Sequence, residues 1–169
     1  NVEAVGQGGA AGIGEGDECS YEGESSIIID SESAYVSAQG EIGIGKSAQS
    51  PSKMDIAIRN GGVSARGYGG AGIGTAERAH GRCYILISGG NVVAYGTGNC
   101  AGIGSGYLAD AGMDINIARG EVTAQGDVNA AGIGTGYQSE SVMSITISGG
   151  RIDAQGGANA AGIGGGFSA

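Results

Sequence analysis

Apolar residues alternate with polar residues in short segments that recur along the chain. One kind of segment carries isoleucine at two positions separated by one residue, as in Ile85 and Ile87. A second kind follows it and repeats the alternation with smaller residues, as in Val92 and Ala94. An apolar residue at every second position is the signature of a strand with one buried face. Each pair of segments therefore predicts two consecutive β-strands, joined at a Gly-Gly or an equivalent corner.

A third recurring segment has the sequence A-G-I-G or a close variant. Its isoleucines are separated by 31, 29, 30, 30 and 30 residues. A period this regular indicates a repeated structural unit that contributes one further strand. The isoleucines are Ile13, Ile44, Ile73, Ile103, Ile133 and Ile163.

The high glycine content argues against α-helices in these units. The chain has 39 glycines among 169 residues, and its longest glycine-free stretch, Glu24 to Gln39, has no 3.6-residue periodicity. Glycine costs about 1 kcal/mol at each helix-interior position. We predict an all-β fold: a right-handed parallel β-helix, or β-solenoid, with about 30 residues and three short strands per coil, and about five coils.

The glycines of the A-G-I-G segments admit two interpretations. If each isoleucine points inward, its neighbours form an outward strip of bare backbone, as at Gly102 and Gly104. These glycines either adopt positive φ in a tight turn or allow close packing. In the second case we expect the following loops or another solenoid to cover the strip.

The three cysteines allow one internal disulfide at most. Cys83 occupies the position that Met54, Met113 and Met143 hold in other units, which predicts a buried structural thiol. The disulfide state of Cys19 and Cys100 stays open.

Charge argues against nucleic acid and anionic membrane surfaces as partners. The chain has eight basic and 17 acidic residues, and nine of the acids precede its first basic residue, Lys46. Such a surface repels phosphate groups. No apolar run approaches the roughly 18 residues that span a bilayer, so we expect no membrane insertion.

The acidic loop near the start of the chain is a candidate calcium site. Carboxylate oxygens suit Ca²⁺, and close carboxylates repel one another unless a cation joins them. A solvated acidic loop is the alternative, and we expect no other cofactor. The candidate ligands are Glu15, Asp17, Glu18, Glu22 and Glu24.

The outward positions of residues 84–95 are unusually apolar and aromatic. Most equivalent positions in other units are polar, whereas this unit has Tyr84, Leu86, Val93 and Tyr95. Aromatic rings on a sheet stack on sugars or are buried by a partner. We therefore consider these four as a ligand-binding surface, with a covering loop or neighbouring solenoid as the alternative. A further aromatic series, Tyr107, Tyr137 and Phe167, predicts a stacked structural ladder.

Candidate catalytic groups are few, and we expect no enzymatic activity. His80 is the one histidine and falls in a loop. Asp55 and Asp114 occupy equivalent outward positions two coils apart, roughly 10 Å on the strand spacing, close to the limit for inverting glycosidase carboxylates. Tyr84 falls between them, and we expect no basic group to join them.

Residues 1–169 fit a single solenoid domain. Asn1–Ala4 match the second strand of a unit and the chain ends just after a third strand. Both ends then present open strand edges. We expect a fragment of a longer repeat array; end-to-end or side-by-side self-association is the alternative.

One repeat unit carries a family resemblance. It runs from Ile145 to Gly166 and has the sequence I-T-I-S-G-G-R-I-D-A-Q-G-G-A-N-A-A-G-I-G-G-G. It resembles glycine-rich A-G-I-G repeat β-solenoid modules of large microbial cell-surface or secreted, adhesin-like proteins. The resemblance implies an extracellular or cell-surface location and a structural or adhesive role, with glycans or another protein surface as partners. Two other functions stay open: a carbohydrate-binding or carbohydrate-processing β-helix, and a subunit of a stacked filament.

Overall fold

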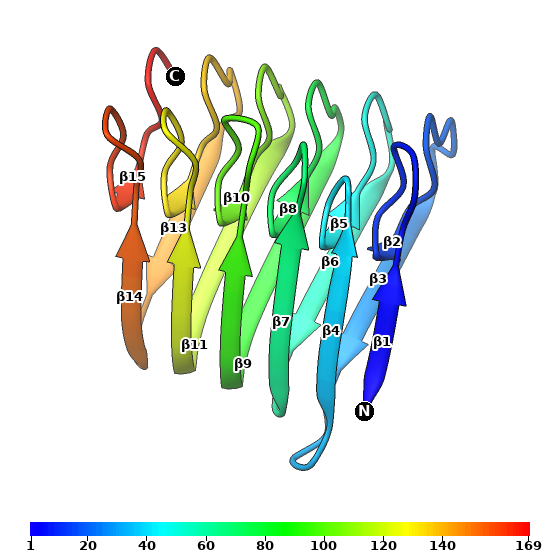
Figure 1. Ribbon diagram of the computed structural model, residues 1–169, viewed down its shortest axis with the longest axis vertical. Coiled ribbons are helices and arrows are strands. Elements are labelled where there is room, and N and C mark those ends of the chain that lie inside the picture. The colour runs from blue at the N-terminus through cyan, green and yellow to red at the C-terminus, as the bar shows by residue number, and fades with distance from the viewer.

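The computed structural model describes residues 1–169 and contains fifteen β-strands and no helix. The chain winds into successive coils that lie side by side, with the N-terminus in the first coil and the C-terminus in the last (Figure 1). Every pairing between the named strands is parallel, and it joins equivalent segments of neighbouring coils. The fold is the parallel β-helix that the sequence predicts.

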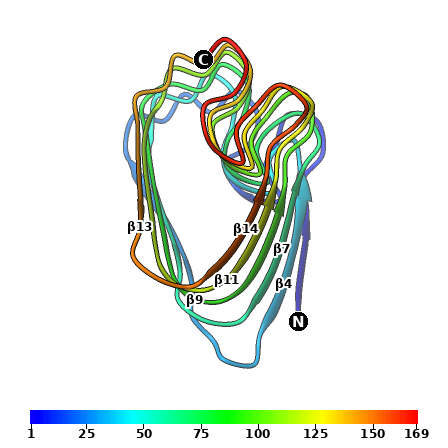
Figure 2. The ribbon, with the colours of Figure 1, turned by 90° about the vertical axis from the view of Figure 1, so that its left-hand side faces the viewer.

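The larger sheet folds into two arms that enclose the core (Figure 2). The first arm contains β3, β6, β13 and the first halves of β9 and β11; the second contains β1, β4, β7, β14 and the remaining halves. The strands are β1 (Val2–Val5), β3 (Glu24–Ile29), β4 (Tyr35–Gly40), β6 (Lys53–Ile58), β7 (Gly62–Gly67), β9 (Arg82–Tyr95), β11 (Gly112–Gln125), β13 (Met143–Ile147) and β14 (Arg151–Gln155).

The corner between the arms is a glycine in each of four coils. Gly61, Gly90, Gly120 and Gly150 have φ angles of 95°, 84°, 105° and 96°, which side chains disfavour. In β9 and β11 the ladder continues through this corner, so each is a single strand of 14 residues. The sequence predicts two strands there, because a turn signal alone does not show whether neighbouring coils keep pairing around the bend.

The smaller sheet contains the A-G-I-G segments, and its strands are only two or three residues long. Equivalent isoleucines and glycines pair in register from coil to coil. Its strands are β2 (Ile13–Gly14), β5 (Ile44–Lys46), β8 (Ile73–Thr75), β10 (Ile103–Gly104), β12 (Ile133–Gly134) and β15 (Ile163–Gly164).

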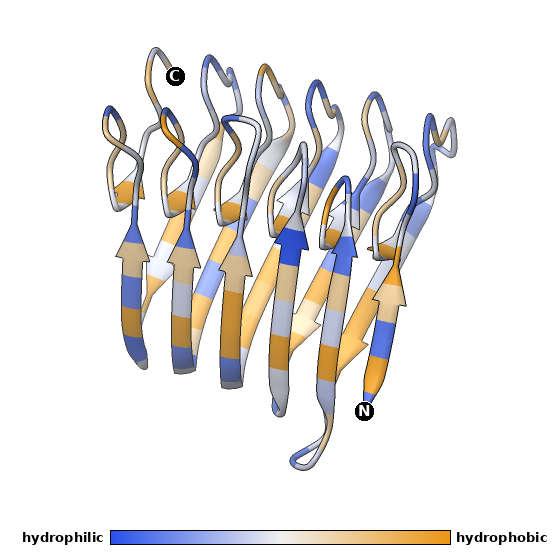
Figure 3. Ribbon diagram, viewed as in Figure 1, coloured by the Kyte–Doolittle hydropathy of each residue, from blue (hydrophilic) through white to orange (hydrophobic).

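The main core is a cluster of 23 buried residues between the arms and the smaller sheet. Ile56, Ile85 and Ile115 stack on one another in register, and similar rows appear as apolar bands across the strands (Figure 3). Cys83 stacks between Met54 and Met113 with 1% of its surface exposed, which confirms its structural interpretation. All three cysteines are free thiols.

The glycines of the smaller sheet are buried except in the first and last coils, so the strip that they form is covered by other parts of the chain. Gly102 and Gly104 are buried, and a Cβ at Gly102 would lie 2.6 Å from the Gln125 nitrogen at the end of β11. Gly104 has a φ of 139°, and a Cβ there would lie 1.9 Å from the Gly134 oxygen. Both interpretations therefore apply: Gly104 has a positive φ, and other parts of the chain cover the strip.

Replacing Gly104 by alanine should destabilise the protein strongly. The backbone conformation costs a side chain about 1–3 kcal/mol, and the clash with the next coil adds to that. Gly165→Ala is the control, because nothing lies within 4 Å of a Cβ at that position. Urea denaturation should show a large loss for Gly104→Ala and a change within about 0.5 kcal/mol for Gly165→Ala. Equal effects would contradict the close-packing argument.

The Cys83 thiol should make stability fall in alkaline solution. Burial raises its pKa to about 12, whereas an unfolded thiol has a pKa near 8.5. Between these values the unfolded chain loses a proton that the folded chain keeps, so stability decreases by up to about 1.4 kcal/mol per pH unit.

Cys83→Met tests this titration with the residue that neighbouring coils use. Denaturation at pH 8 and pH 10 should show a shallower loss in the variant, by at most about 2 kcal/mol. Cys100, whose pKa burial also raises to about 12, remains in both proteins. Identical losses in the two proteins would show that Cys83 does not titrate differently on unfolding.

Candidate functional site

The outer surface of the first arm brings two aspartates and a tyrosine into one row. Asp55 on β6, Tyr84 on β9 and Asp114 on β11 are register partners on adjacent strands. They line a depression of about 250 Å³, and Tyr84 keeps 37% of its surface exposed. The lining residues are Lys53, Met54, Asp55, Arg82, Tyr84 and Asp114.

A second depression of about 280 Å³ continues the first toward β13 and shares Arg82 and Asp114 with it. We call the two together the axial groove, because they cross β6, β9, β11 and β13 along the solenoid axis. The second depression is lined by Gly81, Arg82, Gly112, Met113, Asp114, Val142, Met143 and Ser144.

A basic group does join one of the two aspartates, so the expectation that none would is wrong. Arg82 donates a hydrogen bond of 2.6 Å to Asp114, and Lys53 forms an ion pair of 2.9 Å with Glu24. Arg82 and Lys53 precede the aspartate row by two residues along their strands, which places them on the same outward face. Asp55 forms no ion pair.

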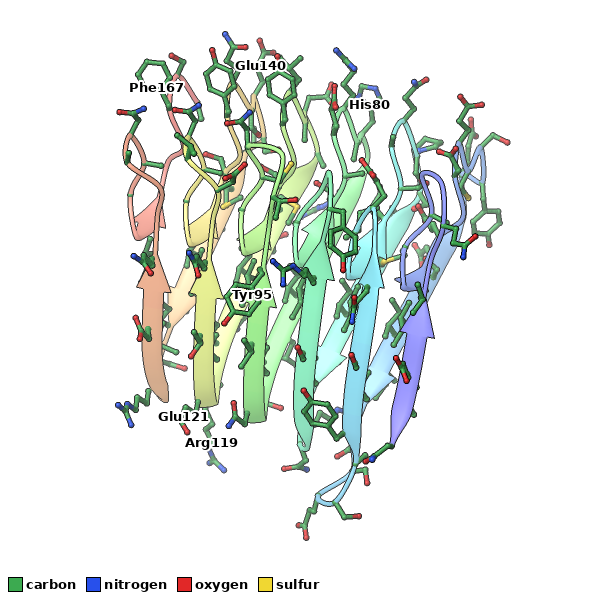
Figure 4. The ribbon with its side chains drawn as sticks, in the orientation of Figure 1. His80, Tyr95, Arg119, Glu121, Glu140 and Phe167 are labelled. Atoms are coloured by element: carbon green, nitrogen blue, oxygen red, sulfur yellow. The ribbon has the colours of Figure 1, made fainter.

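The four residues of the predicted ligand-binding surface do not share one face. Ile87 and Val92, on either side of the β9 corner, both pack into the core. Residues that point outward before and after the corner therefore face opposite sides of the solenoid (Figure 2). Tyr84 and Leu86 lie on the first arm. Val93 and Tyr95 lie on the second, where Figure 4 shows the Tyr95 side chain.

Tyr95 belongs to a separate cluster on the second arm. The Arg66 guanidinium carbon lies 5.8 Å from the centre of the Tyr95 ring and 5.9 Å from that of Tyr68. The Tyr68 hydroxyl donates a 2.6 Å hydrogen bond to Gln39. These contacts hold both rings against the sheet, and cation–π attraction of this kind contributes about 0.5–1 kcal/mol at exposed sites.

The carboxylates of the predicted calcium loop are not gathered into one site. Glu15 points inward with 8% exposed surface, while Glu24 lies on β3 and pairs with Lys53. No three His, Cys, Asp or Glu side chains come together where they could hold a metal ion.

Burial raises the pKa of the Glu41 carboxyl, and the charges of Glu77 and Asp17 raise it further.

Lys46 is a buried charged residue that the sequence analysis missed. It is fully buried, and its ammonium group donates to the backbone oxygens of Ser52 and His80. Glu15 accepts from the Ser47 amide at 3.3 Å and from the Ser52 hydroxyl. Burial lowers the pKa of the Lys46 ammonium group, and the charge of Glu15 opposes that shift.

Glu15 and Lys46 begin an interior row of polar residues that stand two positions after the first five motif isoleucines; Gly165 holds that position after the sixth. The three coils after Lys46 have hydroxyl residues there, and each hydroxyl accepts a backbone N–H from the next coil at 2.8–3.1 Å. The recurrence of Ser or Thr at this position is the signal that could have revealed the row. Its hydroxyl members are Thr75, Ser105 and Thr135.

The loops beyond the smaller sheet also stack in register. The Tyr107 and Tyr137 rings lie 5.4 Å apart and those of Tyr137 and Phe167 5.8 Å apart, which confirms the predicted aromatic ladder. Figure 4 shows Phe167, its last member. The side-chain amides of Asn99, Asn129 and Asn159 form a second ladder, with hydrogen bonds of 3.0 and 2.9 Å between successive members.

His80 lies on an exposed loop (Figure 4), where its ring is hydrogen-bonded to Asp110 of the next coil. Both side chains are about half exposed, at 51% and 50%.

No helix of the structure has the length and apolar character to cross a membrane.

Comparison with protein-family models gives one match, to a family described as a beta helix repeat. It covers residues 85–107, 115–137 and 145–167. Each match runs from a first-arm isoleucine to a member of the aromatic ladder. Neither the curated proteins nor the solved structures gave a match. The family match and the coordinates thus agree that these three coils are β-helix repeats.

Proposed function

We propose that the chain is a non-catalytic structural and adhesive module of an extracellular or cell-surface protein. In this role the solenoid forms a rigid body that holds attached parts at a fixed distance and presents its outer faces to partners. The proposed location comes from the resemblance of the repeat to modules of large microbial surface proteins.

The observation that carries this proposal is that even the loops are fixed from coil to coil. The Tyr137 amide donates to the Asn99 oxygen, and the Phe167 amide donates to the Asn129 oxygen. Together with the asparagine and aromatic ladders, these bonds tie each loop to its neighbours. Loops that carry substrates or close over them usually belong to the less stable parts of a protein. Rigid loops suit a spacer instead.

Hydrogen exchange should show protected loop amides. We expect Tyr137 and Phe167 to exchange nearly as slowly as the strand amides. Asn129→Ala removes two side-chain hydrogen bonds, at about 1 kcal/mol each, and should accelerate exchange in its loop several-fold. Asn116→Ala, on the outer face of β11 and outside the ladder, should leave the loops unchanged. Unprotected loop amides in the native protein would overturn the rigid-spacer role.

Carbohydrate binding is a second candidate function, and the axial groove favours it. A tyrosine ring flanked by two carboxylates offers stacking together with hydrogen-bond acceptors, the combination that sugar rings need. Carbohydrate processing would use the same aspartates as acid and base. Their two-coil separation of roughly 10 Å lies at the upper limit for a pair of glycosidase carboxylates, and Tyr84 stands between them, so we propose binding without cleavage.

Incubation with neutral and acidic polysaccharides should release no new reducing ends. The Asp114→Asn variant serves as the comparison, since it removes one of the two carboxylates and keeps the side chain's shape. Release by the native protein that Asp114→Asn abolishes would establish a catalytic β-helix in place of the structural module.

A further inference from the structure

We propose that the axial groove binds a linear, uncharged glycan whose chain runs along the solenoid axis. This inference rests on carbohydrate binding as the second candidate function, and it adds the direction, the length and the charge class of the ligand.

The direction follows from the shape of the groove. Its two depressions share Arg82 and Asp114 and together cross four strands of the first arm. Neighbouring strands are about 4.8 Å apart, close to the length of one sugar unit in an extended chain. A linear glycan lying along the axis therefore meets one strand per sugar, and the groove accommodates about four units.

Gly112 keeps the middle of the groove open. Its register partner on β9 is Arg82, and its neighbour toward β13 is Val142, which has 82% of its surface exposed. At Gly112 itself the nearest atom to a Cβ would be the Arg82 Cγ at 3.4 Å, an ordinary van der Waals contact, so a Cβ would fit beside the Arg82 side chain. A side chain at this position would separate the two depressions.

The chemistry of the groove suits hydroxyl groups. The exposed Tyr84 ring provides a flat apolar face for a sugar ring. Asp55 has no ion-pair partner, so its oxygens are available to accept hydrogen bonds from hydroxyls. Arg82 uses one nitrogen on Asp114, which leaves its other N–H groups as donors.

The charge of the groove disfavours an acidic glycan. Both of its basic residues, Lys53 and Arg82, are already paired with carboxylates. Asp55 adds an unpaired negative charge, and the whole chain has a net charge of −9. An anionic chain would meet repulsion without a free cation to compensate it. A neutral chain avoids that cost and keeps every hydrogen bond.

Titration calorimetry with defined oligosaccharides tests the proposal. The probes are cellohexaose, xylohexaose and N-acetylated chitohexaose, their disaccharides, and hexagalacturonate as the acidic member. We expect at least one neutral hexaose to bind, its disaccharide to bind at least tenfold more weakly, and hexagalacturonate not to bind. Tighter binding of hexagalacturonate than of every neutral hexaose would overturn the charge argument.

Three variants locate the site. Tyr84→Ala should weaken hexaose binding at least tenfold, whereas Tyr95→Ala, on the opposite face, should leave it unchanged. Gly112→Val should reduce the affinity of the hexaose to that of the disaccharide. The fold should tolerate this valine, because Val142 precedes Met143 just as Gly112 precedes its register partner Met113. Circular dichroism and thermal melting check that each variant folds.

The remaining outcomes distinguish failure of the axial groove from failure of carbohydrate binding or of the structural role. Hexaose binding that survives both Tyr84→Ala and Gly112→Val would overturn the axial groove and leave carbohydrate binding in place. Absence of binding to any oligosaccharide, with protected loops in hydrogen exchange, would overturn both carbohydrate statements and leave the structural role. Hexalysine is titrated as one further probe, and its binding without binding of any oligosaccharide would assign the groove to basic peptides and overturn the proposal.

Discussion

Backbone hydrogen bonds between equivalent residues of successive coils hold every other feature of the solenoid in position. Because each strand pairs in register with its counterpart one coil away, any residue type that recurs in the sequence becomes a row along the axis. Isoleucine rows build the core, and hydroxyl rows bind the backbone of the next coil. Aromatic and amide rows fix the loops. A side chain thus acts mainly on its neighbours in adjacent coils.

The same spacing constrains what each row tolerates. Neighbouring coils lie so close together that a Cβ at Gly104 would be 1.9 Å from the backbone oxygen of Gly134. They also bring charges together, and opposite charges relieve the resulting repulsion along the outer rows. Lys53 with Glu24 and Arg82 with Asp114 are pairs of this kind. Inside the molecule, Glu15 and Lys46 replace the hydroxyl residues of later coils, and backbone groups supply most of their partners.

Sequence reasoning succeeded where a feature depends on one repeat and its copies. The strand positions, the Cys83 stack and the aromatic ladder all follow from residues that recur at a fixed phase. It failed where a feature depends on how the chain bends between segments. Tyr84 and Tyr95 belong to the same alternating pattern, yet the corner at Gly90 places them on opposite faces. The acidic loop likewise looked continuous, while the fold turns Glu15 into the interior.

The sequence by itself determined the repeat, its length and the identity of the inward rows, because period and alternation are properties of the chain. The tertiary structure alone decided which outward residues become neighbours. The axial groove combines Asp55, Tyr84 and Asp114 from three coils with the gap at Gly112. Residues about 30 positions apart form one surface there, because parallel pairing converts the repeat length into a spacing of about 4.8 Å.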